Sequence, residues 1–303
     1  MRVLLALVAL SFFVTALVQA DDKNLGRAGY SYFGGGFDYS QYRETITLNL
    51  ANTPEVASIG AIAVETKSSP AVMYTQRGGG YVSHASGWGF YIQTENSVGN
   101  KNTKESWYID GELAQRDVFT LSRNDIRLLV SKQLDSHQAI LFGGGVKNTK
   151  FTRFSWSYYP VLIPRLSAAE NASLNAFLAG GQSGGSITEE LFKIYPYLGY
   201  ELGNFFLKDQ LGWSWQVQAV AGLPIYSSVI NTSMGNETLN GGFDGYSLDL
   251  EVSLGYRVTR NFMAGVSLKA AYEYQQRITE GRYSLPNNRF SYFFPGASFY
   301  WSF

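Results

Sequence analysis

The chain has 303 residues, equal numbers of acidic and basic residues, and no cysteine. The absence of cysteine excludes disulfides and thiolate metal sites, and the zero net charge gives no sign of nucleic-acid binding. Charged residues make up only 16% of the chain, against about a quarter in an average soluble domain, whereas Tyr, Phe, Trp and Gly are abundant. After the N-terminal segment, no run approaches the ~20 apolar residues of a membrane helix. This composition favours a β-barrel whose strands face lipid on one side.

The N-terminus has the features of a cleavable secretory signal. One basic residue, Arg2, precedes an apolar run over residues 3–18, and small residues lead to Ala20 ahead of two aspartates. A transmembrane anchor is the alternative, but the acidic start and the lack of a basic flank favour cleavage. No cysteine stands at the cleavage site, which excludes a lipoprotein. We therefore expect a signal peptide over residues 1–20 and a single barrel domain over residues 21–303.

Alternation of apolar and polar residues predicts about ten strands, because successive side chains of a strand point to opposite faces. In chain order, the expected strands cover residues 30–43, 71–82, 88–96, 124–134, 139–156, 192–203, 211–226, 246–256, 262–274 and 293–303. Short connections alternate with longer ones, the pattern of periplasmic turns and extracellular loops. The segments 44–70 and 99–119 are long enough to be large loops or to contain one more hairpin, so twelve strands are an alternative.

Aromatic residues bracket most of the aliphatic stretches, as Tyr246 and Tyr256 do at the two ends of one expected strand. Such aromatics form girdles at the two interfaces of a membrane, whereas a water-soluble β-sandwich does not need them at both ends of nearly every strand. The sequence therefore predicts an all-β, transmembrane, antiparallel up-and-down barrel in contact with membrane lipid.

The segment 160–190 is the most distinctive connection. Ser167 and Glu170 have capping-box spacing, apolar residues follow at helical spacing, and Gly180 and Gly181 supply a stop. We expect a short helix over residues 168–179 on the extracellular side. It either enters the lumen as a constriction or plug, or lies over the rim of the barrel.

On this register, inward-facing positions carry charges of both signs. They are Asp38, Glu95, Arg127, Lys147, Arg153, Lys193, Glu201, Asp249, Glu251, Lys269 and Glu273. One interpretation is a salt-bridge network that fills a small barrel, since buried charges must be paired. The other is a narrow polar conduit with little ion selectivity, because rings of a single sign are absent. No metal site and no cofactor are predicted.

The sequence does not indicate an enzyme. Its two histidines, His84 and His137, fall in expected periplasmic turns, far from an active site at the outer rim. An omptin-like protease needs an Asp/His constellation at that rim, and an outer-membrane phospholipase needs a His-x-Ser motif; neither is found. The glycine runs 34–36, 78–80 and 143–145 lie inside expected strands with no following helix, so they are not phosphate loops.

The chain ends in an alternating strand with Gly296, Phe299, Trp301 and a terminal Phe303. This ending resembles the C-terminal signature of bacterial outer-membrane proteins, in which the last strand is recognised by the barrel-assembly machinery. The resemblance implies the outer membrane of a Gram-negative bacterium and names no specific family. Two functions remain open. One is a narrow porin-like channel for ions or small solutes, and the other is a non-conducting surface barrel whose extracellular loops serve adhesion, partner binding or envelope integrity.

Overall fold

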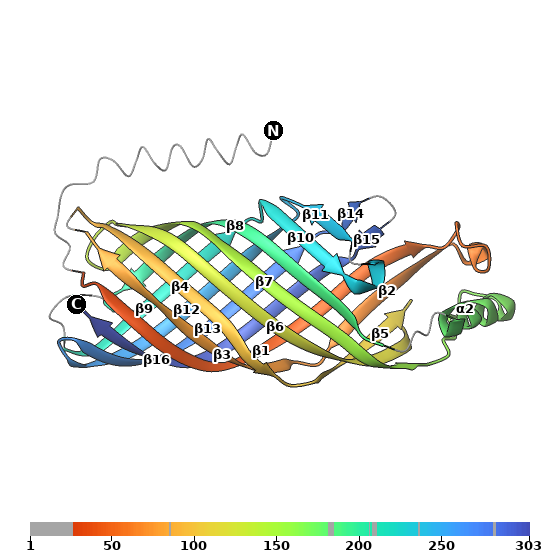
Figure 1. The fold of residues 1–303 in the computed structure, drawn as a ribbon, viewed down its shortest axis with the longest axis horizontal. Coiled ribbons are helices and arrows are strands. Elements are labelled where there is room, and N and C mark those ends of the chain that lie inside the picture. The colour runs from red at the N-terminus through yellow and green to blue at the C-terminus, as the bar shows by residue number, and fades with distance from the viewer. Residues whose placement is uncertain are drawn as a thin grey trace.

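Ten antiparallel strands form a closed barrel in the computed structural model, with every strand tilted to the barrel axis (Figure 1). The structure describes residues 27–84, 86–180, 185–205, 207, 211–235, 237–280 and 283–303, and the expected signal peptide over residues 1–20 lies outside them. In ring order the wall strands are β1 (Tyr30–Asn49), β3 (Ala71–Ser83), β4 (Trp88–Asn100), β6 (Glu112–Gln133), β7 (Gln138–Tyr158), β8 (Ile187–Gly203), β9 (Gly212–Gly222), β12 (Gly245–Thr259), β13 (Phe262–Gln275) and β16 (Asn287–Ser302). The ring closes because β1 pairs with β16 on one side and with β3 on the other. The predicted ten-stranded barrel is therefore confirmed.

Shorter strands lengthen this wall at one end of the barrel. β2 (Ala61–Ser68) pairs with the last part of β1 and with β5 (Thr103–Ile109), and β5 pairs with the first part of β6. β2 leads into β3 across Pro70, which has no N–H to donate to a ladder. The segments 44–70 and 99–119 therefore extend existing strands. The alternative of twelve strands was wrong, because neither segment adds a hairpin to the ring.

The same end carries the remaining elements. β10 (Tyr226–Asn231) continues β9 beyond Pro224 and pairs with β8 and with β11 (Thr238–Gly241). A small hairpin of β14 (Ile278–Glu280) and β15 (Tyr283–Leu285) and two 3-10 turns, η1 (Ala57–Ile59) and η2 (Thr232–Met234), complete it. We call this end the loop end and the opposite one, with its short connections and the C-terminus, the turn end (Figure 1).

The helix α2 (Ala168–Gly180) stands at the loop end, beyond the barrel rim (Figure 1). Ser167 and Glu170 cap it reciprocally: the Ser167 N–H donates to Glu170 Oε2 at 2.8 Å, and the Glu170 N–H donates to Ser167 Oγ at 3.2 Å. Its Leu174 is fully buried in an apolar cluster with Val56 of the β1–β2 connection and with Ile163. The expected helix is confirmed, and it packs on the rim rather than in the lumen. No helix among the described residues is long and apolar enough to cross a membrane.

The outer surface of the wall is apolar over a continuous belt. On β12 the outward side chains from Tyr246 to Tyr256 are all large, apolar and 39–49% exposed. Aromatic pairs mark both margins of the belt: Trp213 contacts Tyr256 on the turn side, and Tyr246 contacts Tyr274 on the loop side. An apolar band between two aromatic girdles is the surface that lipid requires. The wall beyond the loop-side girdle lies outside this belt.

Candidate functional site

Side chains fill the lumen in successive layers, and their order is set by the alternation of each strand. A tyrosine layer lies at the turn end, a central charge layer follows, an apolar layer comes next, and an acidic layer lies at the loop end. Along β8, for example, the buried inward side chains run in the order Glu201, Tyr197, Tyr195, Lys193, Leu191 and Glu189.

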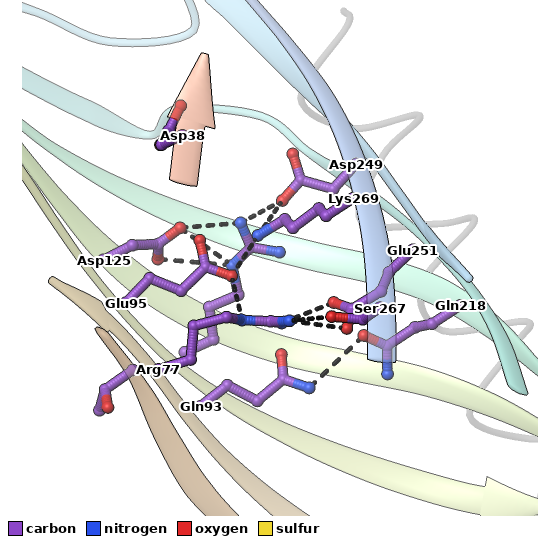
Figure 2. Close-up of polar contacts among 12 residues, drawn as sticks. Asp38, Arg77, Gln93, Glu95, Asp125, Gln218, Asp249, Glu251, Ser267 and Lys269 are labelled. Carbon is purple, nitrogen blue, oxygen red and sulfur yellow. Dashed lines mark hydrogen bonds and ion pairs between the residues drawn. The ribbon is translucent and has the colours of Figure 1, made fainter. Parts of the chain in front are cut away.

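Arg77 of β3 connects two walls through the central charge layer. Its guanidinium donates to both carboxylate oxygens of Glu251 on β12, at 2.8 and 2.6 Å, and to Ser267 Oγ on β13 at 3.1 Å (Figure 2). Three strands, β1, β16 and β13, separate β3 from β12 even on the shorter side of the ring, so this contact crosses the lumen. The two-pronged geometry is the strong form of an arginine–carboxylate pair.

Glu95 of β4 is the anion that the central layer shares most widely. Its carboxylate oxygens lie 2.7 Å from Lys269 Nζ, 3.2 Å from Arg77 Nε and 3.5 Å from an Arg123 guanidinium nitrogen. Lys269 belongs to β13, so this ion pair also crosses the lumen (Figure 2). A carboxylate that is 6% exposed is tolerated in such a place only because cations and hydrogen bonds compensate for its lost hydration.

The other charges of the layer are paired in the same way. Arg127 binds Asp125 at 2.8 Å and also Asp249, Arg123 binds Asp38 at 2.8 Å, and Glu273 binds Lys147 at 3.2 Å and Lys193 at 2.6 Å. Among the described residues, the layer consists of six cations and six anions, namely Arg77, Arg123, Arg127, Lys147, Lys193 and Lys269 with Asp38, Glu95, Asp125, Asp249, Glu251 and Glu273. The layer therefore has no net charge, which buried ion pairs need in order to be stable.

The tyrosine layer closes the turn end of the lumen. Tyr91 donates to Glu201 Oε2 at 2.6 Å and packs on Tyr81 with ring centres 4.5 Å apart, and Arg27 pairs with the other oxygen of Glu201. Glycine makes room for these rings, since a Cβ on Gly145 would lie 2.9 Å from the Tyr197 ring. A cavity between this layer and Arg77 holds about 20 Å³, which is space for one water molecule.

The structure places all eleven charged residues that the sequence assigned to the lumen inside the barrel. Nine of them lie in the central layer; Glu201 lies in the tyrosine layer and Arg153 in the acidic layer. Sequence reasoning missed Arg77, Arg123 and Asp125 in the central layer. It also missed Arg27, Glu44, Glu105, Asp117 and Glu189 elsewhere in the lumen.

The missed residues differ in how visible they were. Arg123 and Asp125 stand four and two residues before Arg127 on one strand, so strict alternation from Arg127 finds them. Arg77 directly precedes a run of glycines, which conceals the alternation. Glu105 lies in a segment for which no strand was expected.

The acidic layer lies above the apolar layer, on the loop side of the lipid-facing belt. Arg153 donates from Nε to Glu105 at 2.7 Å and from its terminal nitrogen to Glu44 at 2.8 Å. Asp117 and Glu189 are buried in the same layer. Burial raises the pKa of Glu105 on β5 to about 7, although Arg153 acts in the opposite direction. Above this layer the barrel mouth encloses a cavity of about 320 Å³.

The two histidines lie away from that mouth. His84 is in the turn between β3 and β4, and His137 is in the turn between β6 and β7. Each ring shares a hydrogen bond with a neighbouring serine, Ser86 or Ser136, and each is exposed at the turn end. Within the part of the chain that the structure describes, no group of His, Asp and Glu side chains could hold a metal ion.

The last strand has the expected two faces. Phe299, Trp301 and Phe303 are 49%, 46% and 75% exposed on the outer surface, and Gly296 faces the lumen beside the Phe294 ring. β16 is also the strand that closes the ring against β1, with Tyr30 opposite Ser302.

One known structure shows the same fold. The outer membrane protease OmpT from Escherichia coli superposes with a TM-score of 0.58 at 12% identity, over 92% of this chain and 97% of that one. OprG, an outer membrane protein of Pseudomonas aeruginosa, is more distant, with a TM-score of 0.33 at 8% identity over 93% of this chain and 99% of its own. No family model and no curated relative matches the sequence. The chain has the fold of bacterial outer-membrane β-barrel proteins. Its lipid-facing belt and closed ring place it in the outer membrane of a Gram-negative bacterium.

Proposed function

We propose that this protein is a non-conducting outer-membrane barrel that acts at the cell surface through its loop end. The observation that carries the proposal is the set of direct contacts across the lumen. Arg77 reaches Glu251, Glu95 reaches Lys269, and Lys147 reaches Glu273 from strands far apart in the ring. Each of these contacts occupies space through which a solute would have to pass.

The size of the barrel supports this proposal. A barrel of about eight strands has an interior that side chains fill, and an aqueous channel needs about sixteen. With ten strands, the lumen below the mouth also contains an aromatic layer and an apolar layer, and the cavity beside Arg77 and Tyr30 is on the scale of a single water molecule. The narrow porin-like channel, the other function open from the sequence, requires these layers to separate.

We further propose that the protein is not a histidine-dependent hydrolase. The OmpT structure is that of a protease, but a likeness at 12% identity concerns the fold. In this chain His84 and His137 are at the turn end, with the filled lumen between them and the mouth. A general base at the mouth would have to be a carboxylate.

Current recordings from planar bilayers test whether the barrel conducts ions. The purified protein is refolded, its folded fraction is determined from heat-modifiable migration on a detergent gel, and a measured amount is reconstituted. We expect a current at the level of protein-free bilayers up to the voltage at which the membrane itself fails. Discrete current steps whose number increases with the amount of folded protein would overturn the proposal and support the channel.

A further inference from the structure

The cavity at the barrel mouth has a wall and a floor of different chemistry. Its volume is about 320 Å³, at the lower end of the range of small-molecule sites, and residues of β1, β2, β5, β6, β7, β8 and β10 line it together with η2 and the end of β15. Most of the wall is apolar or aromatic. Ile46, Val64, Trp107, Trp156, Met234 and Leu285 belong to it.

The floor of the cavity is the acidic layer, in which carboxylates outnumber cations. Among the described residues, Glu44, Glu105, Asp117 and Glu189 surround one guanidinium, that of Arg153. Arg153 is already engaged, with Glu105 at 2.7 Å and Glu44 at 2.8 Å. The central charge layer is balanced, so it does not offset the negative excess of the floor.

Glu189 faces the cavity, and one of its two carboxylate oxygens is available to a ligand. Its residue is 5% exposed and lines the cavity, and its Oε2 accepts a hydrogen bond from Asn231 at 2.9 Å. Over the described ranges, its other oxygen accepts no hydrogen bond and pairs with no cation. Burial raises the pKa of Glu189 to about 7, and above that pH a buried carboxylate oxygen left this way favours a cationic partner.

The aromatic part of the wall suits the same kind of ligand. The indole nitrogens of Trp107 and Trp156 already donate, to Asp117 at 2.8 Å and to the Gly185 carbonyl at 3.2 Å. The Arg153 guanidinium carbon lies 5.4 Å from the centre of the Trp107 ring, and the remaining ring surface of the two indoles attracts cations and apolar groups.

We propose that this cavity binds a small organic cation with a hydrophobic body, of the alkyl- or aryl-ammonium class. The cationic head lies on the floor near Glu189, and the hydrophobic body contacts the wall at Trp107 and Trp156. The inference rests on the proposed function, because it assigns a ligand class to the loop end of a closed barrel. A neutral apolar ligand would leave the negative charge of the floor without a counter-charge, and an anionic ligand would be repelled by it.

Calorimetric titration of the full-length folded protein in a nonionic detergent, which has no ammonium head to compete for the site, tests the inference at pH 8 and against a micelle blank. The probes are benzyltrimethylammonium, benzyl alcohol and benzoate, which share an aryl body and differ in charge. We expect saturable binding of the cation, with the alcohol and benzoate at least tenfold weaker. Equal affinity for all three probes, or no saturable binding of the cation, would overturn the inference.

Neighbouring residues of β8 provide a matched pair of variants. Glu189→Gln keeps the shape of the side chain and removes its charge, so we expect affinity for benzyltrimethylammonium to fall about tenfold or more. Glu190→Gln removes the next charge along, which faces outward and accepts a hydrogen bond from Asn148, and it should bind as the wild type does. Heat-modifiable migration establishes that each variant is folded before titration.

An unchanged affinity in Glu189→Gln, or equal losses in the two variants, would refute the assignment of the floor. Failure of the inference is distinguishable from failure of the proposed function, because current steps in the bilayer concern the lumen and the titration concerns the mouth. A bilayer without current steps, together with no selective cation binding, would support the non-conducting barrel and refute the proposed ligand class.

Discussion

Substitution of Glu95 by glutamine is the sharpest perturbation of the central charge layer. The change keeps the side-chain shape and leaves five carboxylates for six buried cations. Arg77 keeps Glu251 and Arg123 keeps Asp38, but Lys269 keeps only Asp249, at 3.6 Å. Removing one partner from a buried ion pair costs about 3–5 kcal/mol. We expect Glu95→Gln to lower the free energy of unfolding by about 3 kcal/mol. This is the lower end of that range, because two of the three cations retain a close anion.

A double-mutant cycle isolates the pair across the lumen. Lys269→Met restores charge balance in the Glu95→Gln background, so the double variant should regain about 2 kcal/mol over the sum of the single effects. Unfolding by urea in detergent or lipid vesicles is followed by tryptophan fluorescence and by gel mobility. Glu65→Gln on the outer face of β2 serves as the control. Glu65 pairs there with Arg43 and Lys67, whose side chains are about half exposed, so the variant should change stability by less than about 0.5 kcal/mol. A Glu95→Gln effect as small as the control, or additive single effects, would refute the reasoning.

Two further predictions concern the acidic layer and the last strand. Because burial raises the pKa of Glu105 to about 7, above the ~4.3 of an unfolded glutamate, the protonated form contributes stability that is complete below pH ~4 and is lost as the pH rises through 7. The titratable and charged groups around it are Glu44, Asp117, Glu189 and Arg153. We expect the urea midpoint of unfolding to decrease between pH 5 and pH 8, and to decrease less in Glu105→Gln. An equal decrease of the midpoint with pH in the two proteins would contradict this. We also propose that the barrel-assembly machinery recognises the last strand. Deletion of Phe303, which is exposed and contributes little to packing, should then reduce the folded protein in the outer membrane while leaving refolding in detergent intact, and equal losses in both assays would contradict it.

The alternation of side chains made the membrane-facing part of the fold visible in the sequence. Between Phe33 and Tyr39 on β1, lipid faces one side and the packed lumen the other, so every second residue is apolar and outward. Beyond the belt this contrast disappears, because Gln41 and Arg43 face water on the outside. β2, β5 and the first part of β6 lie in that region, which is why they were not predicted as strands.

The glycine runs conceal the same signal inside the belt. Gly79 has a φ of +154°, and a Cβ there would lie 2.0 Å from the Ile92 carbonyl oxygen, so no side chain is available to mark the face. Arg77, two residues earlier, was overlooked for this reason. The helix over residues 168–179 was predicted because its capping box and apolar spacing are local features, and the capping bonds form as expected.

The sequence alone determined the barrel class, the ten-strand count, the helix and the inward face of eleven charges, because each depends on residues a few positions apart. Only the tertiary structure decided which charges meet. The partners Arg77 and Glu251 are 174 residues apart, and their contact depends on ring closure, strand tilt and the diameter that ten strands impose. The placement of Glu189 beneath the aromatic wall has the same origin. The distances across the lumen decide whether the inward charges line a conduit or close it. The alternation of residues along one strand carries no information about those distances.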